Sequence, residues 1–178
     1  SGLSWRRWSV TARVPLEGRE DARMSARDAL SALLGELGEV IGIGRLELDE
    51  GDGCALAFDE RLVLNIAWEE ETGLAALYVE LGGIRDEQRP ALHAAMLAAN
   101  FAGRDTGGGA LGIDPRSGAA VLVRRVDPRG LTAGELEHLL ERLVGAAAAW
   151  MTRLAEPPPP AEEAQVGPET MFQGGLRA

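Results

Sequence analysis

Several residue types that mark common function classes are scarce or missing in this sequence. Its 178 residues include no lysine, two histidines and a single cysteine, Cys54. One cysteine excludes an internal disulfide and a Cys-x-x-Cys metal site, and the motif His-Glu-x-x-His is absent. No run of about 18 apolar residues occurs, so no membrane-spanning helix is predicted. The start of the chain lacks the apolar core of a secretory signal, and a cytoplasmic location is therefore expected.

Positive charge is also in short supply. The net charge is -10 and the pI is about 4.7. Nucleic acids and anionic membranes are both bound by clustered cations, so neither is expected as a partner. Apolar residues make up 46% of the chain, which is enough for one domain with a substantial core.

Residues 45–81 carry the clearest pattern and predict four short strands joined by tight turns. Apolar and polar residues alternate with a period of two, as in strands that bury one face. Residues 51–53, 59–61 and 71–73 have the composition of turns. The connections are too short for parallel crossovers, so the four strands are expected to form an antiparallel meander.

Three helices and two further strands complete the predicted fold. Ser25 and Thr132 stand at N-cap positions before apolar residues at helical spacing, and Pro90 suits the first turn of a helix near 86–101. Strands are expected at 110–114 and 119–126, and the longest helix at 133–154. The predicted class is α+β, an antiparallel twisted sheet packed with three helices in the order α-β-β-β-β-α-β-β-α.

The two ends differ in composition from the predicted domain at residues 25–154. Residues 1–24 mix arginine, glycine, proline and tryptophan without a clear period and are expected to form a weakly ordered N-terminal extension. Residues 155–178 are rich in proline and glutamate and are expected to form a disordered tail.

A search for catalytic chemistry gives no coherent set of residues. The glycines at 107–109 follow a helix and precede a strand, whereas a phosphate-binding loop needs a strand before it and a helix after it. Residues 49–60 have glycine at two ligand positions of a calcium loop, which excludes that site. The run Glu69, Glu70 and Glu71 fits a solvated hairpin turn. These observations favour a binding protein over an enzyme, with no catalytic, metal or cofactor site.

Three segments, taken in order, resemble a known family. They are DGCALAFD at 52–59, LYVELGGI at 77–84, and ALHAAMLAANF at 91–101 followed by TGGGALGID at 106–114. With the final helix ending near Trp150, they resemble the class I type III secretion chaperones, the Tir chaperone (CesT-like) family. The resemblance covers about residues 28–154, and the two terminal segments depart from it.

The resemblance implies a homodimer of α+β protomers with the middle helix at the two-fold interface. It also implies a secreted effector as partner, whose N-terminal region is held in extended form in the bacterial cytoplasm before export, with no cofactor. The residues expected to contact the effector are Leu33, Leu37, Leu46, Leu48, Leu56, Phe58 and Leu64. Those expected at the dimer interface are Leu92, Met96, Leu97 and Phe101.

Two other functions stay open on the sequence. One is a small α+β ligand-binding domain or enzyme that uses the loop Gly107–Gly109. The other is a regulatory adaptor that acts through the proline-rich tail.

Overall fold

A computed structural model describes residues 25–58, 61–103 and 105–156. The elements in chain order are α1 (Ala26–Val40), β1 (Gly53–Phe58), β2 (Leu62–Glu69), β3 (Leu74–Gly83), the 3-10 helix η1 (Asp86–Gln88), α2 (Arg89–Ala102), β4 (Ala110–Ile113), β5 (Ala119–Val126) and α3 (Ala133–Ala155). The α+β class with three α-helices is confirmed. The extension predicted at 1–24 and nearly all of the tail predicted at 155–178 lie outside the described residues.

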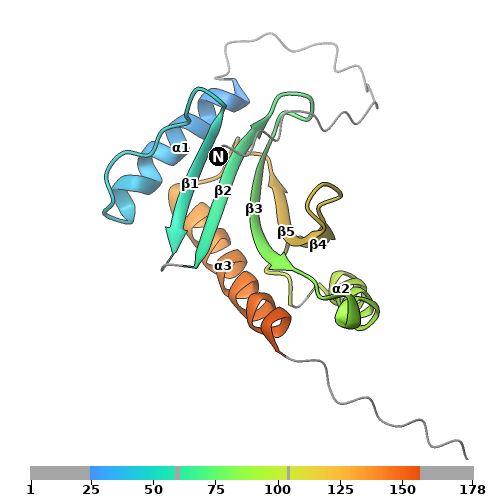
Figure 1. Cartoon of the computed structure of the whole chain (residues 1–178). Helices are drawn as coiled ribbons and strands as arrows, with labels where there is room; N and C mark the ends of the chain where they lie inside the picture. The colour runs from blue at the N-terminus through green and yellow to red at the C-terminus, as the bar shows by residue number, and fades with distance from the viewer. Residues whose placement is uncertain (1–24, 59–60, 104, 157–178) are drawn as a thin grey trace, which may run out of the picture.

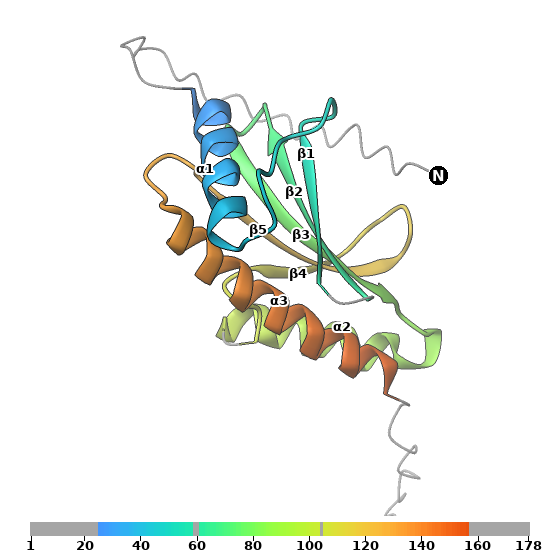
Figure 2. The same cartoon turned by 90° about the vertical axis from the view of Figure 1, so that its left-hand side faces the viewer.

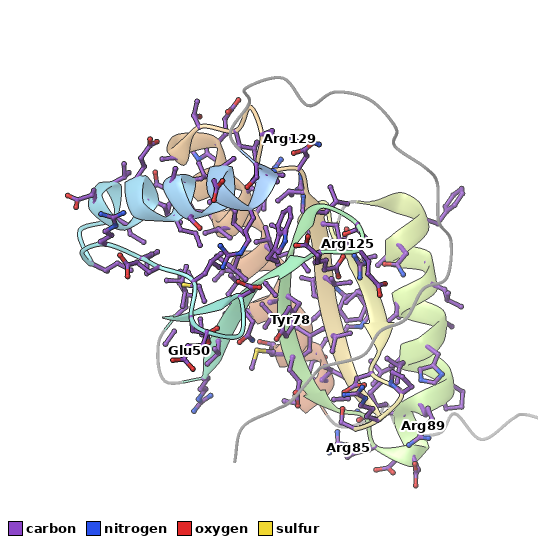
Figure 3. All side chains as sticks on the ribbon, turned by 90° about the horizontal axis from the view of Figure 1, so that it is seen from above. Glu50, Tyr78, Arg85, Arg89, Arg125 and Arg129 are labelled. Carbon is purple, nitrogen blue, oxygen red and sulfur yellow. The ribbon has the colours of Figure 1, made fainter. Side chains whose placement is uncertain are left out.

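One antiparallel sheet organises the fold, with the strand order β1-β2-β3-β5-β4. The meander predicted from the sequence supplies β1 to β3, and β5 then pairs with β3 and places β4 at the far edge. α1 and α3 lie together over one face of the sheet, while α2 lies beyond the β4 end (Figures 1 and 2). β1 and β4 are therefore the two edges of the sheet, and α1 and α2 lie at opposite ends of it (Figure 3).

The strand predicted over residues 45–49 is wrong, so the sheet has five strands where six were expected. This segment returns across the last turns of α1, where the buried Gly38 lets the backbone of Gly44 and Leu46 approach closely. Leu46 and Leu48 are half-buried against the core. The alternation of apolar and polar residues thus arises from packing on the core and not from pairing within the sheet.

The helix ends follow the local chemistry that the sequence predicts. The hydroxyl of Ser25 accepts a hydrogen bond from the backbone N–H of Asp28 at the start of α1. Thr132 and Glu135 form a complete capping box at the start of α3. Gly103 ends α2 in the left-handed conformation, with a φ of 65°. These caps fix where each helix begins or ends, and hence which of its faces meets the sheet.

The core lies between the sheet and the pair formed by α1 and α3. The largest fully buried side chains are Leu30, Leu34, Leu37, Leu64, Ile66, Leu77, Val79, Leu122, Leu136 and Leu143. Burying a side chain of this size stabilises the fold by about 1.5–3 kcal/mol. α1, α3 and the three central strands all contribute to this set, so the sheet and its two covering helices form one cooperative unit.

Candidate functional site

The described residues contain no group of three or more His, Cys, Asp or Glu side chains that could hold a metal ion. Two shallow, open hollows lie along α3, with volumes of about 470 and 450 Å³. Arg124 and Arg142 line the first, where burial, followed by repulsion from Arg142, lowers the pKa of Arg124. None of the described helices combines the length and hydropathy needed to cross a bilayer. The exposed surfaces are therefore the candidate sites.

The glycine loop at 107–109 packs against two neighbouring elements, α3 and β5. A side chain at Gly107 would overlap the carbonyl oxygen of Arg142 on α3, and one at Gly108 would overlap the guanidinium of Arg124. A Cβ at Gly109 would lie 2.8 Å from the carbonyl oxygen of Val123 on β5. The guanidinium of Arg124 also donates a 3.0 Å hydrogen bond to the Gly107 carbonyl. The loop is a close-packed joint between β5 and α3, in which the Gly107 carbonyl is bonded to Arg124 and the Gly109 N–H to the Thr106 carbonyl.

The seven residues predicted to contact an effector divide into two groups. Leu33, Leu37, Leu56 and Leu64 are buried within the core of this chain. Leu46, Leu48 and Phe58 are half-buried and pack on the outside of that core. Only the second group has surface to offer a partner in this conformation. The period of each element identified a shared apolar face, but it did not say which part of that face other elements cover.

Two exposed apolar residues extend the second group, and sequence reasoning did not place them at the site. Val40 ends α1 and is 58% exposed, and Ile43 follows it at 57%. The backbone N–H of Ile43 bonds to the Gly38 carbonyl, which holds this apolar turn beside the segment that carries Leu46. We call Val40, Ile43, Leu46, Leu48 and Phe58 the α1–β1 surface. The signal in the sequence was the run of apolar residues that continues beyond the last full turn of the first helix.

The outer edge of β1 lies beside this surface. β1 pairs with β2 along its inner side, from Gly53 opposite Ala67 to Phe58 opposite Leu62. Within the described residues, the outer side receives one backbone hydrogen bond from the preceding segment, from Asp49 N–H to the Gly53 carbonyl. An edge of this kind can pair with another extended chain.

Acidic side chains gather where β1 begins. Asp49 accepts hydrogen bonds from the backbone N–H groups of Gly51 and Gly53, and Asp52 pairs with Arg27 on α1. Glu50 lies on the same turn (Figure 3). Cys54 is half-buried on β1, where burial, followed by the charge of Asp49, raises the pKa of its thiol. The thiol is held in its neutral form and acts as a small apolar residue.

α2 carries the second exposed apolar surface, and here too the prediction divides. Leu92 and Met96 are buried against the rest of the chain. Leu97 is 70% exposed and Phe101 is 97% exposed. With Ala94 and Ala98, which are also exposed, they form a stripe with the spacing i, i+3, i+4 and i+7, which we call the α2 stripe. A helix with apolar residues on both its inner and outer faces is suited to packing between two partners.

Asn100 joins α2 to the β4 edge of the sheet. Its side-chain amide donates a 3.0 Å hydrogen bond to the Leu111 carbonyl and accepts a 2.8 Å bond from the Leu111 N–H. The side chain thus takes the place of one residue of a neighbouring strand. This pair of hydrogen bonds fixes the position of α2 along the β4 edge of the sheet, and with it the direction in which Leu97 and Phe101 point.

The family comparison agrees with this arrangement. The Tir chaperone protein (CesT) family matches residues 32–151, from within α1 to the last turns of α3. The match covers more than half of the chain and includes both exposed surfaces. The chain belongs to the Tir chaperone (CesT) family. A sequence comparison with curated proteins gave no significant match.

Solved structures of secretion chaperones share the fold of this CesT-family chain. A chain of the HopA1–SchA chaperone–effector complex is 18% identical, with a TM-score of 0.61 over 73% of this chain and 98% of that one. The Yersinia pestis type III secretion chaperone SycH with a fragment of YscM2 gives 21% identity and a TM-score of 0.56, covering 67% and 98%. The Pseudomonas aeruginosa ExoT–SpcS complex gives 25% identity and a TM-score of 0.53, covering 68% and 96%.

Proposed function

We propose that this CesT-family protein is a type III secretion chaperone that binds the N-terminal region of one or more effectors in the bacterial cytoplasm. It keeps that region extended and competent for export, and it does so by binding alone, without catalysis or a cofactor. The observation that carries the proposal is the family match over residues 32–151. Its structural neighbours include a chaperone–effector complex.

We assign the effector to the α1–β1 surface. An extended segment can add to the outer edge of β1 through backbone hydrogen bonds and place alternate side chains against half-buried residues such as Leu46 and Phe58. Val40 and Ile43 enlarge the apolar area at one end. The acidic turn at Asp49 and Glu50 favours effector segments that carry arginine or lysine.

We assign the homodimer contact to the α2 stripe. Leu97 and Phe101 are too exposed to contribute to the core of their own chain. Ala94 and Ala98, on the same stripe, let a second helix approach closely, which suits a copy of α2 related by a two-fold axis. The dimer places the two α1–β1 surfaces at its outer ends, because α1 and α2 lie at opposite ends of the sheet (Figure 3).

Co-expression with effector N-terminal segments tests this function. A matching effector is expected to co-purify with the full chain and to be lost from a Val40→Glu, Ile43→Glu variant, because two charges would face its apolar side chains. Val63→Glu is the matched control, since Val63 is 47% exposed on β2, outside the α1–β1 surface. The proposal fails if no effector segment encoded near this gene binds, or if both variants bind equally well.

The two alternative functions have weaker support. A ligand-binding loop at Gly107–Gly109 would need accessible backbone groups, and that loop is packed between α3 and β5, with the Gly107 carbonyl bonded to Arg124. An adaptor that acts through the tail depends on residues outside the described part of the chain. The proposal therefore rests on the family domain alone.

A further inference from the structure

We propose that the N-terminal extension of this protein occupies the outer edge of its own β1, in the place we assign to the effector. This inference rests on the proposed function for its consequence, because the extension would then compete with the effector. The docking itself concerns the chain alone and can be measured with no effector present.

The first observation is the point at which the extension enters the fold. Residues 1–24 precede Ser25, the N-cap of α1. The guanidinium of Arg27, in the first turn, pairs with the carboxylate of Asp52, the residue immediately before β1. The described chain therefore begins beside the first residues of β1. Within the described part of the chain, the outer side of β1 receives backbone hydrogen bonding only at Gly53, which leaves Cys54 to Phe58 available on that side.

The second observation is a strand pattern inside the extension. Residues 1–24 as a whole show no period, but Trp8, Val10, Ala12, Val14 and Leu16 alternate with polar residues or proline over nine positions. A strand at the edge of a sheet has this pattern when one of its faces is buried. Pro15 is compatible with an edge strand whose N–H side faces solvent.

Chain length and direction agree with the docking. The residues between this segment and Ser25 are 17–24, which span at most about 29 Å when extended. β1 is six residues long, or about 20 Å. A segment anchored beside the start of β1 that runs back along its edge is antiparallel to it, and antiparallel pairing needs no crossover connection. Its apolar side chains would then lie beside those of Cys54 and Phe58, which are half-buried on the helix-covered side of the sheet.

Charge favours the same occupant. Residues 1–16 contain Arg6, Arg7 and Arg13 and no acidic residue. The turn before β1 carries Asp49 and Glu50, and the whole chain has a net charge of -10. The extension thus combines a basic charge with an apolar alternation, the two properties that the α1–β1 surface favours in an effector.

Hydrogen exchange on the full-length chain, purified without an effector, tests the docking. In the wild type, the outward amides of Ala55 and Ala57 are expected to be protected and alkylation of Cys54, the single cysteine, to be slow. A Val10→Glu, Val14→Glu variant should exchange and react about tenfold faster or more. A tenfold change corresponds to about 1.4 kcal/mol of docking free energy.

The matched control is Ser9→Glu, Thr11→Glu, which adds the same charge to the alternate face of the segment. It is expected to keep most of the protection and to bind effector with the affinity of the wild type, whereas the Val10, Val14 variant binds more tightly. Equal exchange in the wild type and in the Val10, Val14 variant would overturn the proposal. Protection that grows with protein concentration would also overturn it, because the occupant would then be a second copy. A chain that shows the docking but binds no effector would refute only the proposed function.

Discussion

Gly38 occupies the interior of α1, a position at which alanine ordinarily stabilises a helix by about 1 kcal/mol relative to glycine. Here a Cβ would overlap the Gly44 carbonyl oxygen and lie 2.9 Å from the Leu46 nitrogen. Both contacts are with backbone atoms, so the return segment would have to move. We expect Gly38→Ala to lower the free energy of unfolding in urea by about 1–3 kcal/mol, the usual cost of overpacking.

Gly35→Ala is the control for this change, one turn earlier on the same helix. The nearest atoms to a Cβ at Gly35 belong to the flexible Arg45 side chain, at 3.7 and 3.8 Å. This variant is expected to be as stable as the wild type or to gain up to about 1 kcal/mol. If the two alanine variants had the same stability, the close crossing of the return segment over α1 would be contradicted.

Glu135 links the capping box of α3 to pH. Hydrogen bonds from the backbone N–H and the hydroxyl of Thr132 lower the pKa of Glu135 below its ordinary value of 4.5. A lowered pKa in the folded state means that the stabilisation is present above pH 4.5 and is lost as the pH falls through the folded-state value. We expect Glu135→Gln to be less stable than the wild type near pH 7. As the pH falls below 5, its free energy of unfolding should decrease less than that of the wild type.

Urea titrations at several pH values measure this difference. Glu137→Gln, in the same first turns of α3 but outside the capping box, is the matched control and should follow the wild-type pH dependence. Parallel pH curves for Glu135→Gln and the wild type would show that the cap carboxylate does not contribute to acid stability.

At the scale of single elements, the α2 stripe gives the sharpest prediction. Leu97→Glu with Phe101→Glu is expected to convert the dimer to a folded monomer, because the charges would be buried without partners in the interface but lie in solvent in the protomer. Light scattering measures the mass and circular dichroism the fold. Met96 is a poor choice for this test, since it is buried within its own chain and a charge there would destabilise the protomer.

Val40→Glu serves as the control for the dimer test, because Val40 is 58% exposed at the end of α1, and α1 and α2 lie at opposite ends of the sheet (Figure 3). It should stay dimeric. A dimer that survives both substitutions on α2 would place the two-fold interface elsewhere.

The sequence predicted element types better than it predicted which residues are exposed. β5 has the predicted bounds, 119–126, because its alternation is long and flanked by turns. Residues 45–49 alternate equally well, yet they lie across α1 and not in the sheet. Met96 and Leu97 are neighbours on one apolar helix, and the packing of α2 against the rest of the fold, including β4, leaves the first buried and the second exposed. Period identifies the apolar faces of an element, whereas tertiary contacts decide what covers them.

At the scale of the whole molecule, the predicted class and family domain follow from the order of landmarks in the chain. The order of landmarks does not predict which apolar residues contact the effector. Four leucines that were assigned to it are buried in the core: Leu33, Leu37, Leu56 and Leu64. A chaperone of this kind must keep some apolar residues outside its core. The sequence fixes their total number, but it does not divide them between core and partner.

The boundary between the family domain and the C-terminal tail gives the last prediction. The Glu156 carbonyl accepts hydrogen bonds from Arg85 and from the buried amide of Gln88, so it ties the end of α3 to the start of α2. A chain that ends at Glu156 should keep full stability, the dimer and effector binding. One that ends at Leu154 should lose about 1–3 kcal/mol in urea, because Gln88 is left buried without this partner. Loss of effector binding in the first truncation would revive the adaptor role of the tail, and equal stability of the two would contradict the tie between α3 and α2.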